Sequence, residues 1–286
     1  MRRQAASVLL IWIGLAASAR ADESIEARTL GAVRDLAFRY ATPEVGRELG
    51  PWLLEAVEWL AARCPGDRDV AAVSAELTAA WSFAFCHEAD PAEAIRLYEL
   101  AWAHAARALS PDGSFARAAV EGGDALDRDL GARTARDVPA LYWGAVAWGA
   151  RLDLQRDSLA TPAELPSVVA ILERVLVLDP GFEYGGPDML IAHQEAILGP
   201  GLGGDNDRMK ARFDASIDRT GGRYLLARVQ RARDYAVAAQ DRDLFETTLR
   251  DVLAASAEDL PERAFFNRVA QERAASYLAR AEEFFP

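Results

Sequence analysis

The fold is decided by the stretch LPSVVAILERVLVLDP, residues 165–180. Its apolar residues Val168, Leu172 and Val175 recur at intervals of four and three, which places them on one face of a helix. Pro180 follows five residues after the last of them and stops the helix. This rhythm is typical of the second helix of a tetratricopeptide repeat, a helical hairpin that buries its apolar face by stacking on another hairpin.

The same intervals recur once downstream, before the glycine pair at 221–222, and once, more faintly, upstream of Pro111. The residues at these intervals are Met209, Phe213 and Ser216 downstream, and Ala94, Tyr98 and Ala101 upstream. No strand-like alternation of any length appears. The sequence therefore predicts an all-α, tetratricopeptide-like protein, a single domain of hairpins over 22–286 stacked in a superhelix (α-solenoid). Repeated glycines and mixed charges predict an irregular insert at about 110–137.

Helix ends are indicated by capping residues and prolines. Asp90 and Asp205 are placed to cap the helices that follow them. Pro51 suits the first turn of a helix. A capping box at 161–164 competes with Pro166 as the start of another helix. We expect the helix proper to begin at Pro166, because a proline deep inside a helix clashes with the carbonyl four residues back.

The N-terminus has the three-part layout of a secretory signal peptide. It has a basic start, an apolar core at 8–17 that is short for a membrane span, and small residues at Ala19 and Ala21. The sequence predicts cleavage of residues 1–21 and export to the periplasm. No cysteine lies near the cleavage point, so we expect no lipoprotein anchor, and no later segment is apolar enough to span a membrane.

The charge of the sequence argues against nucleic-acid and membrane partners, and the placement of its two cysteines argues against a disulfide. Removal of residues 1–21 takes away three arginines and no acid, which changes the formal charge from −12 to about −15. Such a surface repels nucleic acid and anionic membranes. Cys64 and Cys86 are expected as separate thiols, since about 18 residues of helix hold Cys86 roughly 27 Å from the turn beside Cys64.

No familiar catalytic or metal motif is present. The sequence GPGLGG at 199–204 matches a dinucleotide fingerprint in letters, but it follows a helix, so a tight turn is the favoured interpretation. We expect no catalytic residue, no metal and no cofactor. A hydrolase or lyase on a helical frame is the alternative; it predicts an inward cluster of His87, His104 or His193 with carboxylates, whereas a binding protein predicts an apolar groove.

Four linked motifs carry a family resemblance. They are VPALYWGAVAWGA (138–150), LERVLVLDPGFEYGG (172–186), LGPGLGGDNDR (198–208) and TGGRYLLARVQRARDYAVAAQDRDLFETTLRDVLAA (220–255). In this order they resemble the T-component (TatT) family of TRAP transporters, exported helical-repeat proteins. The resemblance implies a non-enzymatic periplasmic accessory component that binds a periplasmic solute-binding protein and forms a homo-oligomer, with a trimer as one form. A generic envelope scaffold is the alternative.

The resemblance also implies a central groove or pore for an apolar or carboxylate ligand. The candidate groove residues are Tyr142, Trp143, Trp148, Phe182, Tyr184, Tyr224, Arg228 and Arg231. The aromatic residues have a second interpretation as packing between helices. The arginines belong to a basic cluster that either forks onto a carboxylate or forms a solvated face paired with residues such as Asp234 and Asp243. Trp52 and Trp59, seven residues apart, share a helix face.

Overall fold

The computed structural model describes residues 24–199, 201 and 203–285. The predicted signal peptide, 1–21, lies outside the described residues. Within them the chain forms helices and turns and no strand, so the predicted all-α class is confirmed. None of the described helices combines the length and the apolar character that a membrane span needs. The α-helices are α2 (Ile25–Tyr40), α3 (Pro43–Arg63), α4 (Arg68–Trp81), α5 (Pro91–Leu109), α6 (Ser114–Glu121), α7 (Gly123–Ala132), α8 (Val138–Leu154), α9 (Thr161–Leu178), α10 (Gly186–Leu198), α11 (Asn206–Thr220), α12 (Leu225–Arg231), α13 (Arg242–Ala254), α14 (Ala264–Ala279) and α15 (Ala281–Phe284).

Side-chain caps set where many of these helices begin. The Asp205 carboxylate accepts from the backbone N–H groups of Asp207 and Arg208 at 2.8 and 3.0 Å, and Asp90 accepts from Glu93 N at 3.1 Å. These bonds satisfy donors that have no partner within the helix. Both predicted caps are therefore confirmed. The other side-chain caps are Ser24, Thr42, Asp67 and Asp241.

The repeated intervals mark the buried face of the second helix of successive hairpins. All nine predicted positions, on α5, α9 and α11, are at most 2% exposed. A fourth set with the same intervals, Phe245, Leu249 and Val252 on α13, is fully buried and was not predicted. The pattern thus identifies the helix face that each hairpin buries against its neighbours.

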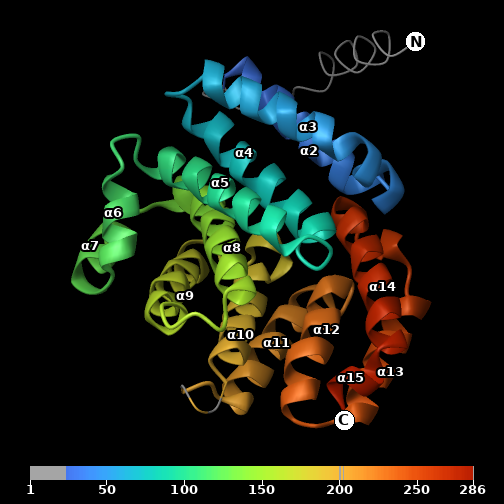
Figure 1. Ribbon diagram of the computed structural model, residues 1–286. Coiled ribbons are helices and arrows are strands. Elements are labelled where there is room, and N and C mark those ends of the chain that lie inside the picture. Colours follow the sequence, from blue (N-terminus) through green and yellow to red (C-terminus); the bar gives the residue numbers. More distant parts are fainter. Residues whose placement is uncertain (1–23, 200, 202, 286) are drawn as a thin grey trace, which may run out of the picture.

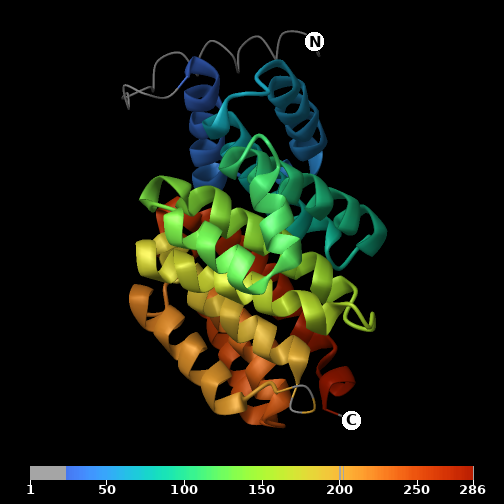
Figure 2. The ribbon, with the colours of Figure 1, turned by 90° about the vertical axis from the view of Figure 1, so that its left-hand side faces the viewer.

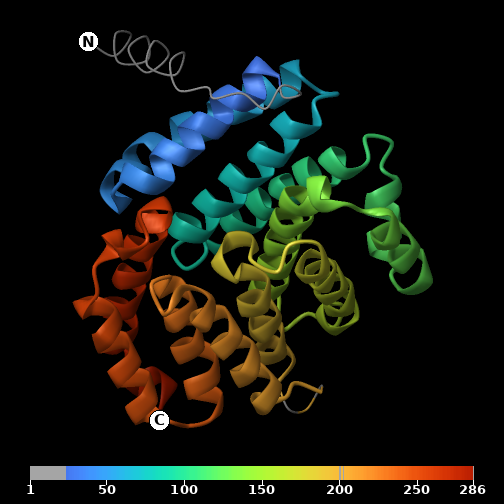
Figure 3. The same cartoon turned by 180° about the vertical axis from the view of Figure 1, so that it is seen from behind.

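The hairpins pack in chain order, as Figure 2 shows from the first hairpin downward. The path then closes on itself, because α14 packs against both α12 and α2 (Figures 1 and 3). At this closure Phe38 of α2 contacts Phe265 and Phe266 of α14, with ring centroids 6.3 and 4.9 Å apart. The Arg47 guanidinium also pairs with Glu272 at 2.5 Å. The two ends of the described chain therefore stabilise each other.

The expected irregular insert at 110–137 is helical. It forms α6, α7 and the short 3-10 helix η2 (Ala135–Asp137), and the pair α6–α7 lies on the outside of the molecule (Figure 1). Two of its glycines form turns: Gly113 and Gly122 precede α6 and α7 with φ of 75° and 70°, whereas Gly123 begins α7 and Gly131 lies inside it. Gly113 and Gly122 therefore mark the turns of this segment, while Gly131 does not interrupt its helix.

Two predicted helix starts are wrong. Helix α3 begins at Pro43 and holds Pro51 in its interior, because Thr42 caps it and Trp81 packs against Gly50 and donates to Gly46 O at 3.4 Å. Helix α9 begins at Thr161 and holds Pro166 in its interior. The predicted separation of the two cysteines is confirmed: both are free, and Cys86 is buried.

Candidate functional site

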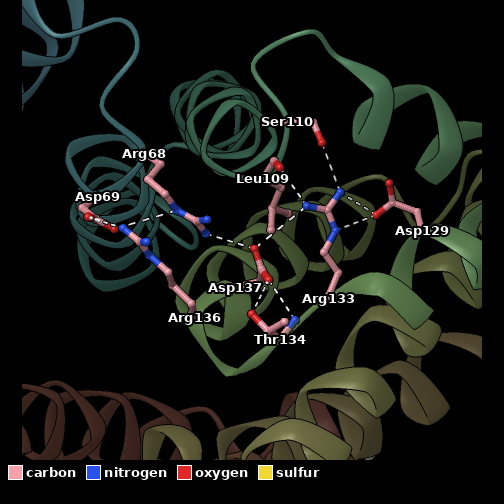
Figure 4. Close-up of polar contacts among 9 residues, drawn as sticks. All are labelled: Arg68, Asp69, Leu109, Ser110, Asp129, Arg133, Thr134, Arg136 and Asp137. Atoms are coloured by element: carbon pink, nitrogen blue, oxygen red, sulfur yellow. Dashed lines mark hydrogen bonds and ion pairs between the residues drawn. The ribbon is translucent and has the colours of Figure 1, made fainter. Parts of the chain in front are cut away.

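The insert is fixed to the rest of the fold by a polar network around Asp137 (Figure 4). The Asp137 carboxylate accepts from Thr134 N at 2.8 Å, Thr134 Oγ1 at 3.0 Å and Arg68 Nη2 at 3.0 Å. Arg136 of the insert pairs in turn with Asp69 of α4 at 3.3 Å. Burial alone would raise the pKa of Asp137, but the bonds from Thr134 and Arg68 outweigh it and hold the pKa below its ordinary value.

Arg133 ties the same insert to the end of α5. Its guanidinium donates to Leu109 O at 2.7 Å, Ser110 Oγ at 3.1 Å and Asp129 Oδ1 at 2.7 Å (Figure 4). It also lies 5.2 Å from the centroid of the Phe115 ring on α6. The insert is therefore held in one position against α5.

A small pocket lies beside the insert, between α5, α6, α8 and α9. Its volume is about 120 Å³. The lining residues, here called the tryptophan pocket, are Tyr98, Glu99, Trp102, Val120, Ala147, Trp148, Arg151 and Glu164. The rings of Trp102 and Trp148 are 4.7 Å apart and inclined at 53°, and Phe115 supports Trp102 at 5.8 Å. Aromatic faces thus form much of the wall.

Glu164 organises the polar edge of the tryptophan pocket. Its Oε2 accepts from Trp148 Nε1 at 2.7 Å and from Arg151 Nη2 at 2.5 Å, while Arg151 Nη1 donates to Gln155 at 2.8 Å. The capping box that competed with Pro166 as the start of α9 does not form either. The Thr161 hydroxyl instead donates to the backbone oxygen of Gln155 at 2.8 Å, and Glu164 turns toward α8.

A second polar assembly joins the hairpins in the interior, and we call it the histidine–aspartate chain. Tyr98 Oη lies 3.1 Å from His87 Nδ1, and His87 Nε2 lies 3.2 Å from Asp153 Oδ2. The same Asp153 oxygen is 3.7 Å from His193 Nε2, and His193 Nδ1 is 2.8 Å from Asp234 Oδ2. The charged side chains of the chain are 5–15% exposed. Tyr98 belongs to this chain and also lines the tryptophan pocket.

The histidine–aspartate chain holds a buried positive charge, on His193, between two carboxylates. Burial would lower the pKa of His193, but Asp234 and Asp153 outweigh burial and raise it to about 10. Burial would raise the pKa of Asp153, and the neighbouring His193, His87 and Arg156 instead hold it well below its ordinary value. At neutral pH His193 is an imidazolium that joins α8, α10 and the segment after α12.

Two π-helical segments place the ends of this chain. The first, η1 (Ser82–Cys86), directly precedes His87, and the backbone N–H of His87 donates to Ser82 O at 2.9 Å. The second, η5 (Ala232–Ala236), contains Asp234. An extra residue in a helical turn rotates the side chains after it onto a new face, and such segments are frequent at functional sites. Helical periodicity alone could not have indicated these positions.

A comparison with models of protein families identifies the family of this chain. The family model of the TRAP transporter T-component matches residues 41–285. The chain belongs to the TRAP transporter T-component family. The resemblance predicted from the four motifs is thereby confirmed. No curated protein matches the chain.

In this T-component chain five of the six predicted groove aromatics lie around one short 3-10 turn, η3 (Phe182–Tyr184), and the sixth, Trp148, lies elsewhere. Tyr142 contacts Trp143 and Phe182, each with centroids 5.2 Å apart, and Tyr184 lies 6.2 Å from Tyr224. Trp148 lies apart from these five, in the tryptophan pocket. Tyr142, Trp143, Trp148 and Tyr224 are 3–5% exposed, while Phe182 and Tyr184 are half-buried. Packing between helices accounts for the four buried rings.

The predicted arginine cluster does not converge on one point. Arg228 pairs with Asp251 and Arg231 with Asp214, each at 3.5 Å. Of the suggested partners, Asp234 bonds His193 instead. The two guanidinium groups therefore have separate carboxylate partners, as a paired helix face would.

Arg263 braces a strained turn at the closure of the chain. Glu183 and Tyr184 are both in the left-handed region, with φ of 48° and 58°. The Glu183 carboxylate forms a two-fold ion pair with Arg263, whose guanidinium also lies 5.2 Å from the Phe38 ring and 5.4 Å from the Tyr184 ring. This ion pair is largely buried, so it holds the turn against α2.

The T-component chain also exposes an apolar stripe on its first hairpin. The α3 stripe consists of Val45, Leu49, Trp52 and Trp59, which share one face of the helix. Trp52 and Trp59 are 69% and 61% exposed. The face shared by these two tryptophans, noted in the sequence, thus points to solvent.

Proposed function

We propose that this protein is a non-enzymatic, periplasmic accessory component of a TRAP-type transport system that binds a periplasmic solute-binding protein. Membership of the T-component family supports a role in transport, and the signal-peptide layout of the first 21 residues supports the location. The homo-oligomer and the ligand groove implied by the resemblance belong to the same proposal.

The observation that carries the proposal is the α3 stripe. Large apolar side chains at 61–69% exposure on one face are typical of a binding surface. Tryptophan is also the residue that most often anchors protein interfaces, because it buries a large rigid surface in a partner's pocket. We assign this stripe to the solute-binding protein, with Trp52 and Trp59 as the anchors.

The histidine–aspartate chain bears on the enzymatic alternative, which expects histidines to meet carboxylates. His87 and His193 do meet Asp153, as that alternative requires. However, each nitrogen of these two rings already has a partner in the chain, and His104 is bonded to Glu58 at 2.6 Å and to Arg107 at 3.1 Å. A general base needs a nitrogen that can reach the substrate's proton. The arrangement therefore favours a structural ion network over acid–base catalysis.

Metal chemistry has little support in the same region. Among the described residues, no group of three or more histidine, cysteine, aspartate or glutamate side chains has a metal-binding geometry. The proposal accordingly assigns the protein a binding role.

Capture from a periplasmic extract tests the proposal. The signal-free chain serves as bait, and the retained proteins are identified by mass spectrometry. The matched variants are Trp52→Ala with Trp59→Ala, and as a control Val177→Ala with Leu253→Ala, which removes exposed apolar side chains elsewhere. We expect wild type and control to retain a TRAP solute-binding protein and the stripe variant to lose it.

The other outcomes contradict the proposal in different ways. Retention of unrelated envelope proteins alone supports the generic scaffold. If the stripe variant captures the solute-binding protein as well as wild type does, the docking surface is not on α3. A wild type that elutes as an oligomer, with a stripe variant that elutes as a monomer, assigns the stripe to a second copy of the chain instead.

A further inference from the structure

The tryptophan pocket has the size and the walls of a small-ligand site. Its volume of about 120 Å³ is of the same order as the apolar cavity of ~150 Å³ that admits benzene. Trp102 and Trp148 contact each other, with ring centroids 4.7 Å apart, and line the pocket together with Tyr98, which is fully buried. Its occupant is therefore no larger than about one six-membered ring with a short substituent.

The aromatic walls favour a positively charged occupant. The face of an indole or phenol ring carries negative charge and attracts a cation within about 6 Å of its centre. Of the three aromatic residues that line the pocket, Tyr98 is fully buried and Trp148 is 5% exposed, so the half-buried Trp102 offers a ligand the most ring surface. Glu164 accepts from the Trp148 N–H. A ligand therefore meets the Trp102 ring, while the indole N–H of Trp148 is already bonded to Glu164.

The charged residues at the edge of the tryptophan pocket also favour a positively charged ligand. The Arg151 guanidinium is neutralised by Glu164, and both bonds to Glu164 fall on one oxygen, Oε2. Within the described residues Oε1 accepts no hydrogen bond, and Glu99 adds an exposed carboxylate at the edge. The lining thus carries one net negative charge and has acceptors to spare. A carboxylate ligand would have to displace Glu164 from Arg151.

We propose that the tryptophan pocket binds a small organic cation, an ammonium group on a ring or short chain of about the size of benzene. The site is built before the ligand arrives, since the Asp137 and Arg133 contacts hold the insert, and with it Val120, in place. It lies apart from the α3 stripe, on other helices. The proposal is therefore independent of partner docking, and either can fail alone.

Three probes of one shape and different charge test the proposal: benzylammonium, benzyl alcohol and benzoate. Each is titrated into the signal-free chain at pH 7 and followed by calorimetry and tryptophan fluorescence. We expect benzylammonium to bind most tightly, about fivefold more tightly than benzyl alcohol, as one cation–π contact of ~1 kcal/mol provides. Benzoate should bind most weakly.

Variants of the pocket locate the binding. Glu164→Gln keeps an acceptor for Trp148 and removes the charge, and Glu99→Gln changes an exposed group, so it leaves the fold intact. Each should weaken benzylammonium about two- to fivefold and leave benzyl alcohol unchanged. Trp102→Leu should weaken both probes. The control Glu26→Gln, on an exposed position of α2, should change nothing.

Two results would overturn the assignment. Benzoate binding as tightly as benzylammonium would show that Arg151 directs the site toward anions. Benzylammonium affinity that is undetectable, or unchanged in Glu99→Gln, Glu164→Gln and Trp102→Leu alike, would show that the pocket is not the site of a cation.

Discussion

Replacement of His193 by glutamine tests whether the histidine–aspartate chain holds a buried positive charge. The imidazolium lies 2.8 Å from Asp234 and 3.7 Å from Asp153, and its pKa rises from 6.5 to about 10. One pKa unit corresponds to 1.36 kcal/mol, so this rise in the pKa of His193 contributes at most about 5 kcal/mol to the free energy of unfolding. The variant leaves two buried carboxylates without their cation, so we expect a loss of about 3–5 kcal/mol.

The pH dependence distinguishes this charge from simple packing. Because the folded pKa lies above the unfolded one, the stabilisation is complete below about pH 6.5 and is lost as the pH rises toward 10. Urea unfolding of wild type and His193→Gln at pH 7.5 and 9.5 should therefore show a difference in stability that narrows by about 2 kcal/mol.

His104→Gln is the matched control. Burial lowers the pKa of His104, so this ring loses no proton between pH 7.5 and 9.5 and its variant should show a constant difference from wild type. A constant difference for His193→Gln as well would refute the buried imidazolium.

Three further substitutions test the packing, the closure and the insert. Gly50→Ala should lower the free energy of unfolding in urea by about 1–3 kcal/mol, because the new Cβ would lie 1.7 Å from Trp81 Nε1. Gly31→Ala, whose Cβ would lie 3.8 Å from its nearest neighbour, should raise it by about 0.5–1 kcal/mol. Arg263→Gln leaves a buried carboxylate unpaired; we expect a loss of about 3 kcal/mol and faster hydrogen exchange in α2, and unchanged exchange there would contradict the closure. Asp137→Ala should speed tryptic cleavage within 110–137, and its stability deficit at pH 7 should shrink as the pH falls below about 4, because the lowered pKa stabilises only the ionised form.

Local signals in the sequence predict the hairpins well. The intervals around Leu172 and Phe213 fix the buried helix faces, and Asp205 fixes a helix start, because these features depend only on neighbours within a few turns. The proline at 166 misled the prediction, since packing keeps α9 helical on both sides of it. The set containing Phe245 was missed because no glycine or proline follows it at the expected distance.

The sites depend on contacts that no local pattern encodes. Asp153 meets His87 and His193 across 66 and 40 positions of sequence only after three hairpins have stacked, and a π-helical turn decides where Asp234 points. Glu164 similarly acquires its role from α8, not from its own helix. By contrast, the face shared by the two tryptophans of α3 was readable, since it needs only helical geometry.

The affinity of a purified TRAP solute-binding protein for the signal-free chain tests the central claim most directly. We expect saturable binding to wild type and to the Val177→Ala, Leu253→Ala control. Trp52→Ala with Trp59→Ala should weaken it about thirtyfold or more, because an interface tryptophan typically contributes ~2 kcal/mol or more. No binding to wild type, or equal affinity in the stripe variant, would contradict the account.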